Sequence, residues 1–372
     1  MTAKTKMRKT KPRSPTLRSR TRVLVTGVTG GGVGFGVLEA LIKAGYQVYA
    51  TDITPYSVGL LKARKGFVVP LASEASYLKT IRTICRKNKI RIIVPGSESE
   101  LFHLSEKSAE LEEKGLLLIT NDHRLIATCR DKWKMFKMFR DNGIPCPDSG
   151  LPEMYDDFRA RHGFPILLKQ RTGSGSRNLL IAKNHEDYLF CSAKLNNEHL
   201  PFLLQEYIGK ESEEYTVGVV CRKDGSVLGS ITVHRILEGL SVLARTNIGD
   251  RTVKVSTGIS QGTIEDNKLI QGQCESYAVK LGVTGPANFQ GRLIDGLFTV
   301  FELNPRFSGT TTFRASVGFN DVDMVIRDRL NQSVMKPKFR SGIVALRSLE
   351  NVLVPLERIR KLSVVREGVE NG

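Results

Sequence analysis

The stretch Phe298-Thr-Val-Phe-Glu302-Leu-Asn304-Pro-Arg306-Phe-Ser-Gly309 presents a carboxylate, an amide and a guanidinium within five residues. Its apolar first half predicts a buried strand, and alternate side chains of a strand share a face, so we expect Glu302 and Asn304 to point the same way. Magnesium prefers hard oxygen ligands of this kind and is commonly shared between them and nucleotide phosphates. On this stretch alone, a solvated edge strand explains the residues equally well.

A second strand is expected just before the first, in Gly285-Pro-Ala-Asn288-Phe-Gln290-Gly-Arg292, across a turn at Asp295-Gly296. Asn288 and Gln290 share a face of this strand and would add amide oxygens to those of the first. The two strands together therefore predict a site for a divalent cation.

The composition is that of a soluble globular protein, with 40% apolar and 25% charged residues in a chain of 372. A chain of this length predicts two or three compact units. No apolar run reaches the length of a membrane span and no signal-peptide pattern opens the chain, so we expect a cytoplasmic protein without a membrane partner. The six cysteines are scattered without metal-binding spacing, which predicts reduced thiols.

The net charge of +18 is unevenly spread, because residues 1–22 hold nine basic and no acidic side chains, half of the total. We expect residues 1–21 to form a disordered basic leader, since they are too polar to pack. A solvated tail is the preferred interpretation, and attraction to nucleic acid is the alternative. An organelle transit peptide is disfavoured because the leader has no apolar face.

The segment after the leader predicts a Rossmann-type β-α-β unit. Arg22-Val-Leu-Val-Thr26 predicts a strand, a glycine-rich turn leads into a helix that ends at Gly45, and a second strand ends at Asp52. Asp52 could bind the ribose of a dinucleotide, but no register of the glycines fits Gly-x-Gly-x-x-Gly. A dehydrogenase is therefore disfavoured, and we interpret the glycines as letting the helix pack close to the strand.

Alternating strands and helices continue to residue 120, with helices expected over 77–88 and 101–114, which predicts a doubly wound α/β domain over residues 22–120. Glu98 and Glu100 follow the apolar strand 91–95, at the edge where such sheets bind ligands. Acidic residues at the start of a helix are the commoner explanation for this pair.

The middle of the chain combines basic residues with small ones. Asp131 is a good helix cap, so a helix is predicted to begin at Lys132, and Lys169 ends an apolar strand. The loop after that strand is made of small residues, among them Gly173, Ser174, Gly175 and Ser176. Small residues let backbone N–H groups turn toward a phosphate, which favours a hairpin lid over a nucleotide, with a plain hairpin turn as the alternative.

A strand with a break follows, in Phe202-Leu-Leu-Gln205-Glu206-Tyr207-Ile208-Gly209, and Glu214 lies at the start of the next strand. A break exposes backbone donors and acceptors that can bind the edge of an adenine, and a carboxylate beyond it could accept the hydroxyl protons of a ribose.

Taken in order, these residues resemble those of the ATP-grasp superfamily, above all the synthetase halves of the carbamoyl-phosphate synthetase large subunit and the related carboxylate–amine ligases. The resemblance covers about residues 22–330 and is carried by Asp131-Lys132, Lys169 with its glycine loop, Gln205-Glu206-Tyr207-Ile208, Glu214-Tyr215, Asn288-x-Gln290 and Glu302-x-Asn304-x-Arg306. It implies a Rossmann-like domain over 22–120, an ATP-grasp domain over 121–330 with a lid over about 150–205, and an extension of the last lobe over 331–372.

The resemblance also implies roles for single residues. ATP would be bound by Lys132, Lys169, Gly173, Ser174, Gly175, Ser176, Gln205, Glu206, Ile208 and Glu214, with Glu206 and Ile208 at the adenine and Glu214 at the ribose. Mg²⁺ or Mn²⁺ would be bound by Gln290, Glu302 and Asn304. Arg306 would be the catalytic residue that faces the transferred phosphoryl group.

The function that the resemblance implies is an ATP-dependent, ADP-forming ligase, which activates a small-molecule carboxylate as an acyl phosphate and joins it to an amine. A homodimer is compatible with it, whereas the single grasp unit disfavours carbamoyl phosphate as the product. The alternative is a grasp-fold protein that binds ATP without ligase activity and associates with nucleic acid through its leader. Arg235, Arg245, Arg251 and Lys254 hint at an anionic substrate, although solvated strand faces explain them nearly as well.

Overall fold

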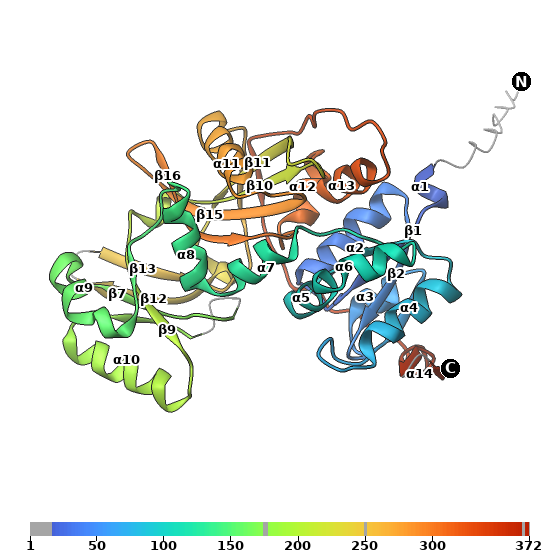
Figure 1. The fold of residues 1–372 in the computed structure, drawn as a ribbon, viewed down its shortest axis with the longest axis horizontal. Coiled ribbons are helices and arrows are strands. Elements are labelled where there is room, and N and C mark those ends of the chain that lie inside the picture. The colour runs from blue at the N-terminus through green and yellow to red at the C-terminus, as the bar shows by residue number, and fades with distance from the viewer. Residues whose placement is uncertain (1–16, 174–177, 249–250, 367–368, 372) are drawn as a thin grey trace, which may run out of the picture.

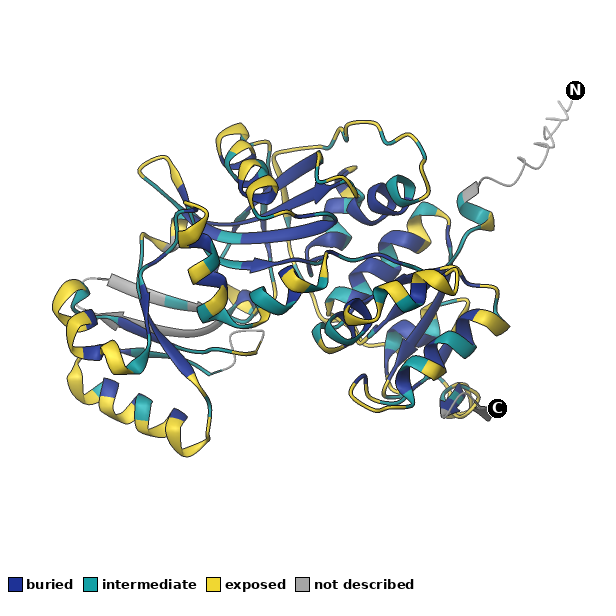
Figure 2. Ribbon diagram, in the orientation of Figure 1, coloured by how far each residue is buried: buried dark blue, intermediate teal, exposed yellow. Residues whose placement is uncertain are grey.

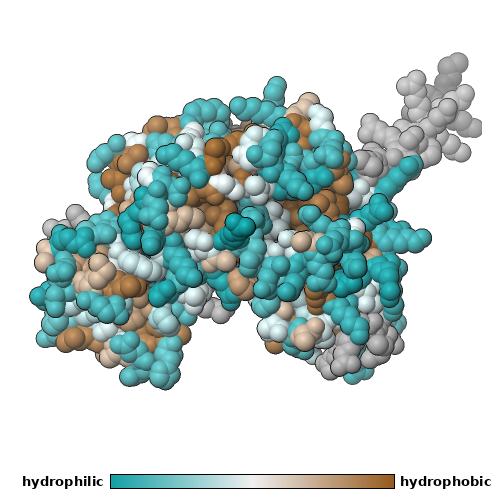
Figure 3. All heavy atoms as spheres, viewed as in Figure 1, coloured by the Kyte–Doolittle hydropathy of each residue, from teal (hydrophilic) through white to brown (hydrophobic). Residues whose placement is uncertain are grey.

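The computed structural model describes residues 17–173, 178–248, 251–366 and 369–371, which form an amino-terminal domain, a lid and a carboxyl lobe (Figure 1). In Figure 3 hydrophilic side chains cover much of the visible face, and the outline is indented between the lid and the amino-terminal domain. No helix among the described residues is long and apolar enough to cross a membrane.

The amino-terminal domain is built on a seven-stranded sheet in the order β19-β18-β3-β2-β1-β4-β5, parallel except at β19. Its strands are β1 (Arg22–Thr26), β2 (Gln47–Asp52), β3 (Lys65–Val68), β4 (Ile92–Val94), β5 (Leu117–Leu118), β18 (Ser363–Arg366) and β19 (Val369–Asn371). Its helices are α1 (Leu17–Arg20), α2 (Val33–Ala44), α3 (Val58–Lys62), α4 (Tyr77–Lys87), α5 (Glu98–Glu106), α6 (Ser108–Glu113) and α14 (Leu356–Arg360), and α7 (His123–Arg130) leads to the next lobe.

The lid is a four-stranded antiparallel sheet in the order β6-β9-β7-β8, flanked by two helices. The strands are β6 (Ser149–Gly150), β7 (Ile166–Gln170), β8 (Leu179–Ala182) and β9 (Phe202–Glu206), and the helices are α9 (Tyr155–His162) and α10 (His185–Asn197). Figure 2 shows α10 with a broad exposed face, as expected for a helix that packs on the lid from one side.

The carboxyl lobe carries a six-stranded antiparallel sheet in the order β16-β15-β10-β11-β14-β17, with the hairpin β12-β13 beside it. The strands are β10 (Glu214–Cys221), β11 (Val227–Arg235), β12 (Val242–Ile248), β13 (Arg251–Ser256), β14 (Gly262–Glu265), β15 (Pro286–Ile294), β16 (Leu297–Asn304) and β17 (Ile343–Ala345). The helices are α8 (Lys132–Asp141), α11 (Lys268–Lys280), α12 (Thr311–Val317) and α13 (Asp321–Arg329).

One apolar core joins the amino-terminal domain to the carboxyl lobe. It contains Val37 and Leu41 of α2, Ile231 of β11 and Val325 of α13, all fully buried. The lid has a separate core, which includes Phe158 and surrounds its own sheet. Because apolar burial is the main stabilising term, we expect the amino-terminal domain and the carboxyl lobe to stay together when the lid moves.

The glycine-rich turn after β1 does pack the helix close to the sheet, as predicted. A Cβ at Gly34 would lie 2.2 Å from the carbonyl oxygen of Gly27, and one at Gly96 would lie 2.1 Å from that of Thr26. Asp52 is buried and accepts a hydrogen bond from Thr29 Oγ1 of this turn at 2.9 Å.

The predicted helix over 77–88 is confirmed to within one residue, as α4. The helix predicted over 101–114 is instead two helices, α5 and α6. The six cysteines are free thiols, four buried and two partly buried, as predicted.

The carboxyl-terminal segment does not extend the last lobe alone. Residues 343–345 add β17 to the carboxyl lobe as expected, but β18 pairs in parallel with β3 of the amino-terminal domain, through Ser363 opposite Phe67. The prediction for 331–372 is therefore wrong for its second half. A short strand such as β18 can join any sheet with an open edge, so its local sequence does not identify the partner.

The basic leader is also shorter than predicted. Residues 17–20 form α1, and Arg18 of this helix makes a bidentate ion pair with Asp323, with its shorter distance 2.6 Å. The expectation of disorder is thus wrong for these residues, because α13 supplies a carboxylate for them. Residues 1–16, on which the rest of the prediction depends, lie outside the described residues.

Candidate functional site

The predicted cation ligands lie on the neighbouring strands β15 and β16, where Gln290 is directly opposite Glu302. The register shifts by one residue beside this pair, which is a β-bulge. A bulge re-aims side chains. Val300 before it points into the apolar core, whereas Phe301, Glu302 and Asn304 all line one cleft. Glu302 and Asn304 therefore face the same way, as predicted.

Asn288 does not join these ligands. Its side-chain oxygen accepts hydrogen bonds from Arg314 Nη2 at 2.7 Å and from Thr216 Oγ1 at 3.0 Å, in the interior of the lobe. The suggestion that Asn288 supplements the cation site is therefore wrong, because a buried arginine already uses its amide oxygen.

The donor set fits Mg²⁺ better than a transition metal. It consists of one carboxylate and two amides, and within the described part of the chain no three His, Cys, Asp or Glu side chains group as metal ligands. Magnesium is typically bound by one or two protein oxygens together with substrate phosphates, not by a full protein cage. A cation here would therefore be completed by an anionic ligand in the cleft.

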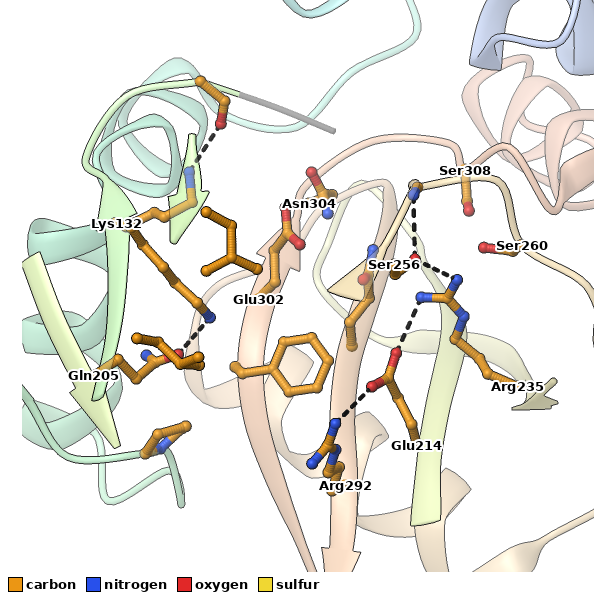
Figure 4. A pocket seen from close by; sticks show the side chains of 18 of the residues that line it. Lys132, Gln205, Glu214, Arg235, Ser256, Ser260, Arg292, Glu302, Asn304 and Ser308 are labelled. Carbon is orange, nitrogen blue, oxygen red and sulfur yellow. Dashed lines mark hydrogen bonds and ion pairs between the residues drawn. The ribbon is translucent and has the colours of Figure 1, made fainter. Parts of the chain in front are cut away.

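The cleft lies between the lid and the carboxyl lobe and has a volume of about 260 Å³. Its walls contain most of the predicted site residues, namely those for the nucleotide or metal and the catalytic Arg306: Lys132, Lys169, Gly173, Gln205, Glu206, Ile208, Glu214, Gln290, Glu302, Asn304 and Arg306. Ser174, Gly175 and Ser176 lie outside the described residues. Sequence motifs spread over 175 positions are thus brought to one site, part of which is shown in Figure 4.

Lys169 lies at the lid side of the cleft, at the end of β7. Its ammonium donates to the side-chain oxygen of Gln205 and lies 5.5 Å from the centre of the Phe301 ring. Burial lowers the pKa of Lys169 to about 8, although the nearby Glu302 carboxylate opposes the shift. Gln205 is held in turn by Ser149 at 3.1 Å, so the lysine is fixed in position.

Lys132 is connected to the glycine loop of the lid. Asp131 caps α8 as predicted and makes an ion pair of 2.5 Å with Arg171. The backbone N–H of Lys132 donates to the Arg171 carbonyl at 2.9 Å, and its ammonium donates to the Gly173 carbonyl at 2.8 Å. The start of α8 and the base of the loop therefore form one hydrogen-bonded unit.

Glu206 and Ile208 flank the strand break, but some of their polar groups already bind other residues of the protein. The Glu206 carboxylate accepts from the backbone N–H of Asp148 at 2.7 Å and lies 3.2 Å from the His162 ring. The Ile208 carbonyl accepts from Arg292 Nη1 at 2.6 Å. A nucleotide base bound beside these residues would therefore meet backbone groups rather than the Glu206 side chain.

Glu214 lies between two arginines from the neighbouring strands. Arg235 Nη1 donates to one carboxylate oxygen at 3.1 Å, and Arg292 Nη2 donates to the other at 3.2 Å. All three residues are about 5% exposed. Glu214 is thus the shared counter-ion of two buried guanidinium groups, a role that its position at the start of a strand did not reveal.

Arg306 is held by the amino-terminal domain. Its Nη2 makes an ion pair of 2.8 Å with Glu98 at the start of α5, and its Nη1 donates to the Phe307 carbonyl at 3.0 Å. Glu100, in contrast, is buried and bonded to Tyr77 at 3.0 Å and Ser97 at 2.7 Å. Of the two acidic residues after β4, only Glu98 reaches the cleft, through Arg306.

Sequence reasoning missed several residues of the cleft. The turn residues Gly31 and Gly32 of the amino-terminal domain line it, as do Arg292, Ser256, Ser260 and Ser308. Gly31 has a φ of +81°, in the left-handed region that favours glycine over other residues. A Cβ at this position would meet open space. The serines carry no recognisable motif, so only the fold could reveal them.

The architecture is that of the ATP-grasp class, in which a doubly wound domain precedes two α+β lobes that enclose a cleft of basic and oxygen-donor side chains. Two family models match the chain: "PylC-like, N-terminal domain" over residues 27–119 and "ATP-grasp in the biosynthetic pathway with Ter operon" over residues 198–351. Residues 198–351 are thus similar to the ATP-grasp family, and residues 27–119 are similar to the amino-terminal domain of PylC-like proteins.

Among curated proteins, the carbamoyl phosphate synthase large chain of Mycobacterium sp. (strain JLS) is 26% identical over 209 residues, which is 55% of this chain and 18% of that protein. The chain thus matches less than a fifth of the length of this relative.

Two solved structures show the same fold. The biotin carboxylase domain of the Hydrogenobacter thermophilus 2-oxoglutarate carboxylase, with MgADP and bicarbonate, has a TM-score of 0.62 at 19% identity and covers 84% of this chain and 70% of its own. Carboxyaminoimidazole ribonucleotide synthase from Aspergillus clavatus, with ATP, has a TM-score of 0.63 at 15% identity and covers 86% and 79%.

Proposed function

We propose that the protein is an ATP-dependent, ADP-forming ligase that activates a substrate carboxylate as an acyl phosphate and joins it to an amine or similar nucleophile. The observation that carries the proposal is the single cleft in which Gln290, Glu302 and Asn304 face Lys169 and Arg306. Phosphoryl transfer depends on positioning and charge neutralisation, which this set of side chains supplies. The neighbours crystallised with MgADP and ATP support the same assignment.

The nucleotide would lie along the lid side of the cleft. Lys132 and Lys169 would neutralise its phosphates, and the loop that begins at Gly173 would cover them. The Ile208 carbonyl already accepts from Arg292, so we assign the adenine contact of this residue to its N–H. Mg²⁺ bound by Gln290, Glu302 and Asn304 would withdraw charge from the phosphate oxygens.

In the first step a carboxylate oxygen of the substrate attacks the γ-phosphorus, the bond to the β–γ bridging oxygen breaks, and ADP leaves. In the second step an amine attacks the acyl carbon, inorganic phosphate leaves, and the amine loses a proton. Arg306 would stabilise the negative charge on the transferring group, and the closed lid would keep water from the acyl phosphate.

The proposal is tested by incubating the protein with MgATP and panels of carboxylates and amines while ADP, AMP, phosphate and pyrophosphate are measured. We expect ADP and phosphate in equal amounts, increased by the correct pair of substrates. Formation of AMP and pyrophosphate would contradict the mechanism, because it would place the attack on the α-phosphorus.

The affinity for ATP should fall as the pH rises above about 8. The pKa of Lys169 is lowered to about 8, and only the protonated ammonium attracts phosphate, so the Kd of MgATP should rise by up to about tenfold per pH unit above that value. Isothermal titration calorimetry between pH 7 and 9.5 measures this. The matched variant Lys169→Arg stays charged and should give a flat profile, and an equally steep profile in that variant would assign the titration to another group.

Glu98→Gln should slow turnover without weakening nucleotide binding. The variant loses the ion pair that orients Arg306, which is partly exposed, so we expect kcat to fall by about three- to tenfold. Glu113→Gln, at an exposed position on α6, is the matched control and should change nothing. An altered Kd for MgADP in Glu98→Gln, at unchanged kcat, would contradict a role through Arg306.

A further inference from the structure

The end of the cleft remote from the lid has a chemistry of its own. The side chains that line it are cationic or carry hydroxyl groups, and we call it the basic end: Arg235, Lys254, Ser256, Ser260 and Ser308. Figure 4 shows Arg235, Ser256, Ser260 and Ser308 on one side of Glu302, and Lys132 and Gln205 on the other. The basic end is thus separate from the lysines assigned to the ATP phosphates.

Arg235 lines the inner wall of the basic end. Its side chain is only 2% exposed, and it binds Glu214 through Nη1 at 3.1 Å and Ser256 Oγ through Nη2 at 2.7 Å. Ser256 also accepts from the backbone N–H of Gly258 at 3.1 Å, so the chain after β13 is fixed on the guanidinium group. The hydroxyl group is thereby held at a defined place in the wall of the cleft.

Lys254 lies two residues before Ser256 on β13, so its side chain shares the face of that serine. It is 18% exposed, and its carboxylate neighbour, Glu238, lies 3.9 Å away and is itself 67% exposed. A solvated strand face does not explain Arg235, because its side chain is buried, and Lys254 lines the same cleft. The side chains of Arg245 and Arg251 lie outside the described part of the structure.

The charges at this end do not balance within the described residues. Arg235 and Arg292 are both buried, and among the described residues they share one carboxylate, that of Glu214. Two buried guanidinium groups with one carboxylate leave an excess positive charge, which is unfavourable in a site that a lid can close to water. A bound anion would relieve the excess.

We propose that the substrate whose carboxylate is activated carries a second anionic group, a carboxylate or a phosphate, and that Lys254, Ser256 and Ser260 hold this group at the basic end. This inference rests on the proposed function, because it places the first carboxylate beside Arg306. Ser308, two residues after Arg306, also lines the basic end. One substrate molecule therefore places one anionic group beside Arg306 and the other at the basic end. The substrate class is then a dicarboxylate or a phosphorylated carboxylate.

The test compares three probes on the full chain saturated with MgADP: succinate, phosphonoacetate and the monoanion acetate. Binding is measured by calorimetry and by the shift in unfolding temperature, which ligand binding raises. We expect at least one dianion to bind tenfold or more tightly than acetate. A preference for succinate identifies a carboxylate as the second group, and a preference for phosphonoacetate identifies a phosphate.

Lys254→Gln should weaken binding of the preferred dianion at least tenfold and leave acetate and MgADP unchanged, and Ser256→Ala should weaken it less. Lys268→Gln, whose lysine is exposed and paired with Asp266, is the matched control and should bind the dianion as the original chain does. Equal binding of all three probes, or an unchanged dianion affinity in Lys254→Gln, would overturn the inference. A protein that failed to bind MgADP would instead contradict the proposed function.

Discussion

Glu302→Gln should reduce MgATP turnover about a thousandfold while the fold persists. Glu302 is the one carboxylate among the predicted cation ligands, and it faces Gln290 across the strand pair. Bound metal ions contribute several kcal/mol to phosphoryl transfer, and each 1.36 kcal/mol corresponds to a tenfold change in rate. The amide of the variant keeps the shape of the side chain and removes the charge that holds the ion.

A second measurement separates loss of the metal from loss of the fold. In the original chain Mg²⁺ should increase the affinity for ADP, and in Glu302→Gln this increase should disappear while metal-free ADP still binds. The unfolding temperature should stay close to that of the control Glu113→Gln. Unchanged stimulation by Mg²⁺ in the variant would remove Glu302 from the metal site, and the enzyme assignment would lose its main support.

The motifs of this site could be predicted from the sequence because each one depends on local chemistry. Asp131 is a helix cap, Lys169 ends an apolar strand before a loop of small residues, and Glu302 and Asn304 have the two-residue spacing of a strand face. Each of these features depends on only a few neighbouring residues. The β-bulge that turns Glu302 into the cleft does not, since it arises from the pairing of β15 with β16.

Long-range pairing explains the other errors. Glu214 is opposite Arg292 in the register of β10 and β15, although the two residues are 78 positions apart. β18 lies near the carboxyl end of the chain but joins the sheet of the amino-terminal domain, and the side chain of Asn288 accepts a hydrogen bond from Arg314 of a later helix. Such contacts depend on which strands become neighbours, and the periodicity of a single segment does not predict the neighbours of its strand.

Glu214→Ala should destabilise the protein by about 3–5 kcal/mol, the cost of leaving buried charges without their partner. Both guanidinium groups that bind Glu214 would be unpaired at once, since each uses a different oxygen of this one carboxylate. Chemical denaturation measures the change in the free energy of unfolding. Glu265→Ala, which breaks a half-exposed contact with His234 on the neighbouring strand, should cost less than about 1 kcal/mol.

The double variant Glu214→Ala with Arg292→Met should be less destabilised than the sum of the two single variants, because the second change removes one of the orphaned charges. This coupling distinguishes a counter-ion from a residue whose main contact is the ribose of ATP. If Glu214→Ala were as stable as Glu265→Ala and lost only nucleotide affinity, the two arginines would not depend on the carboxylate. The excess charge at the basic end would then no longer argue for a dianionic substrate.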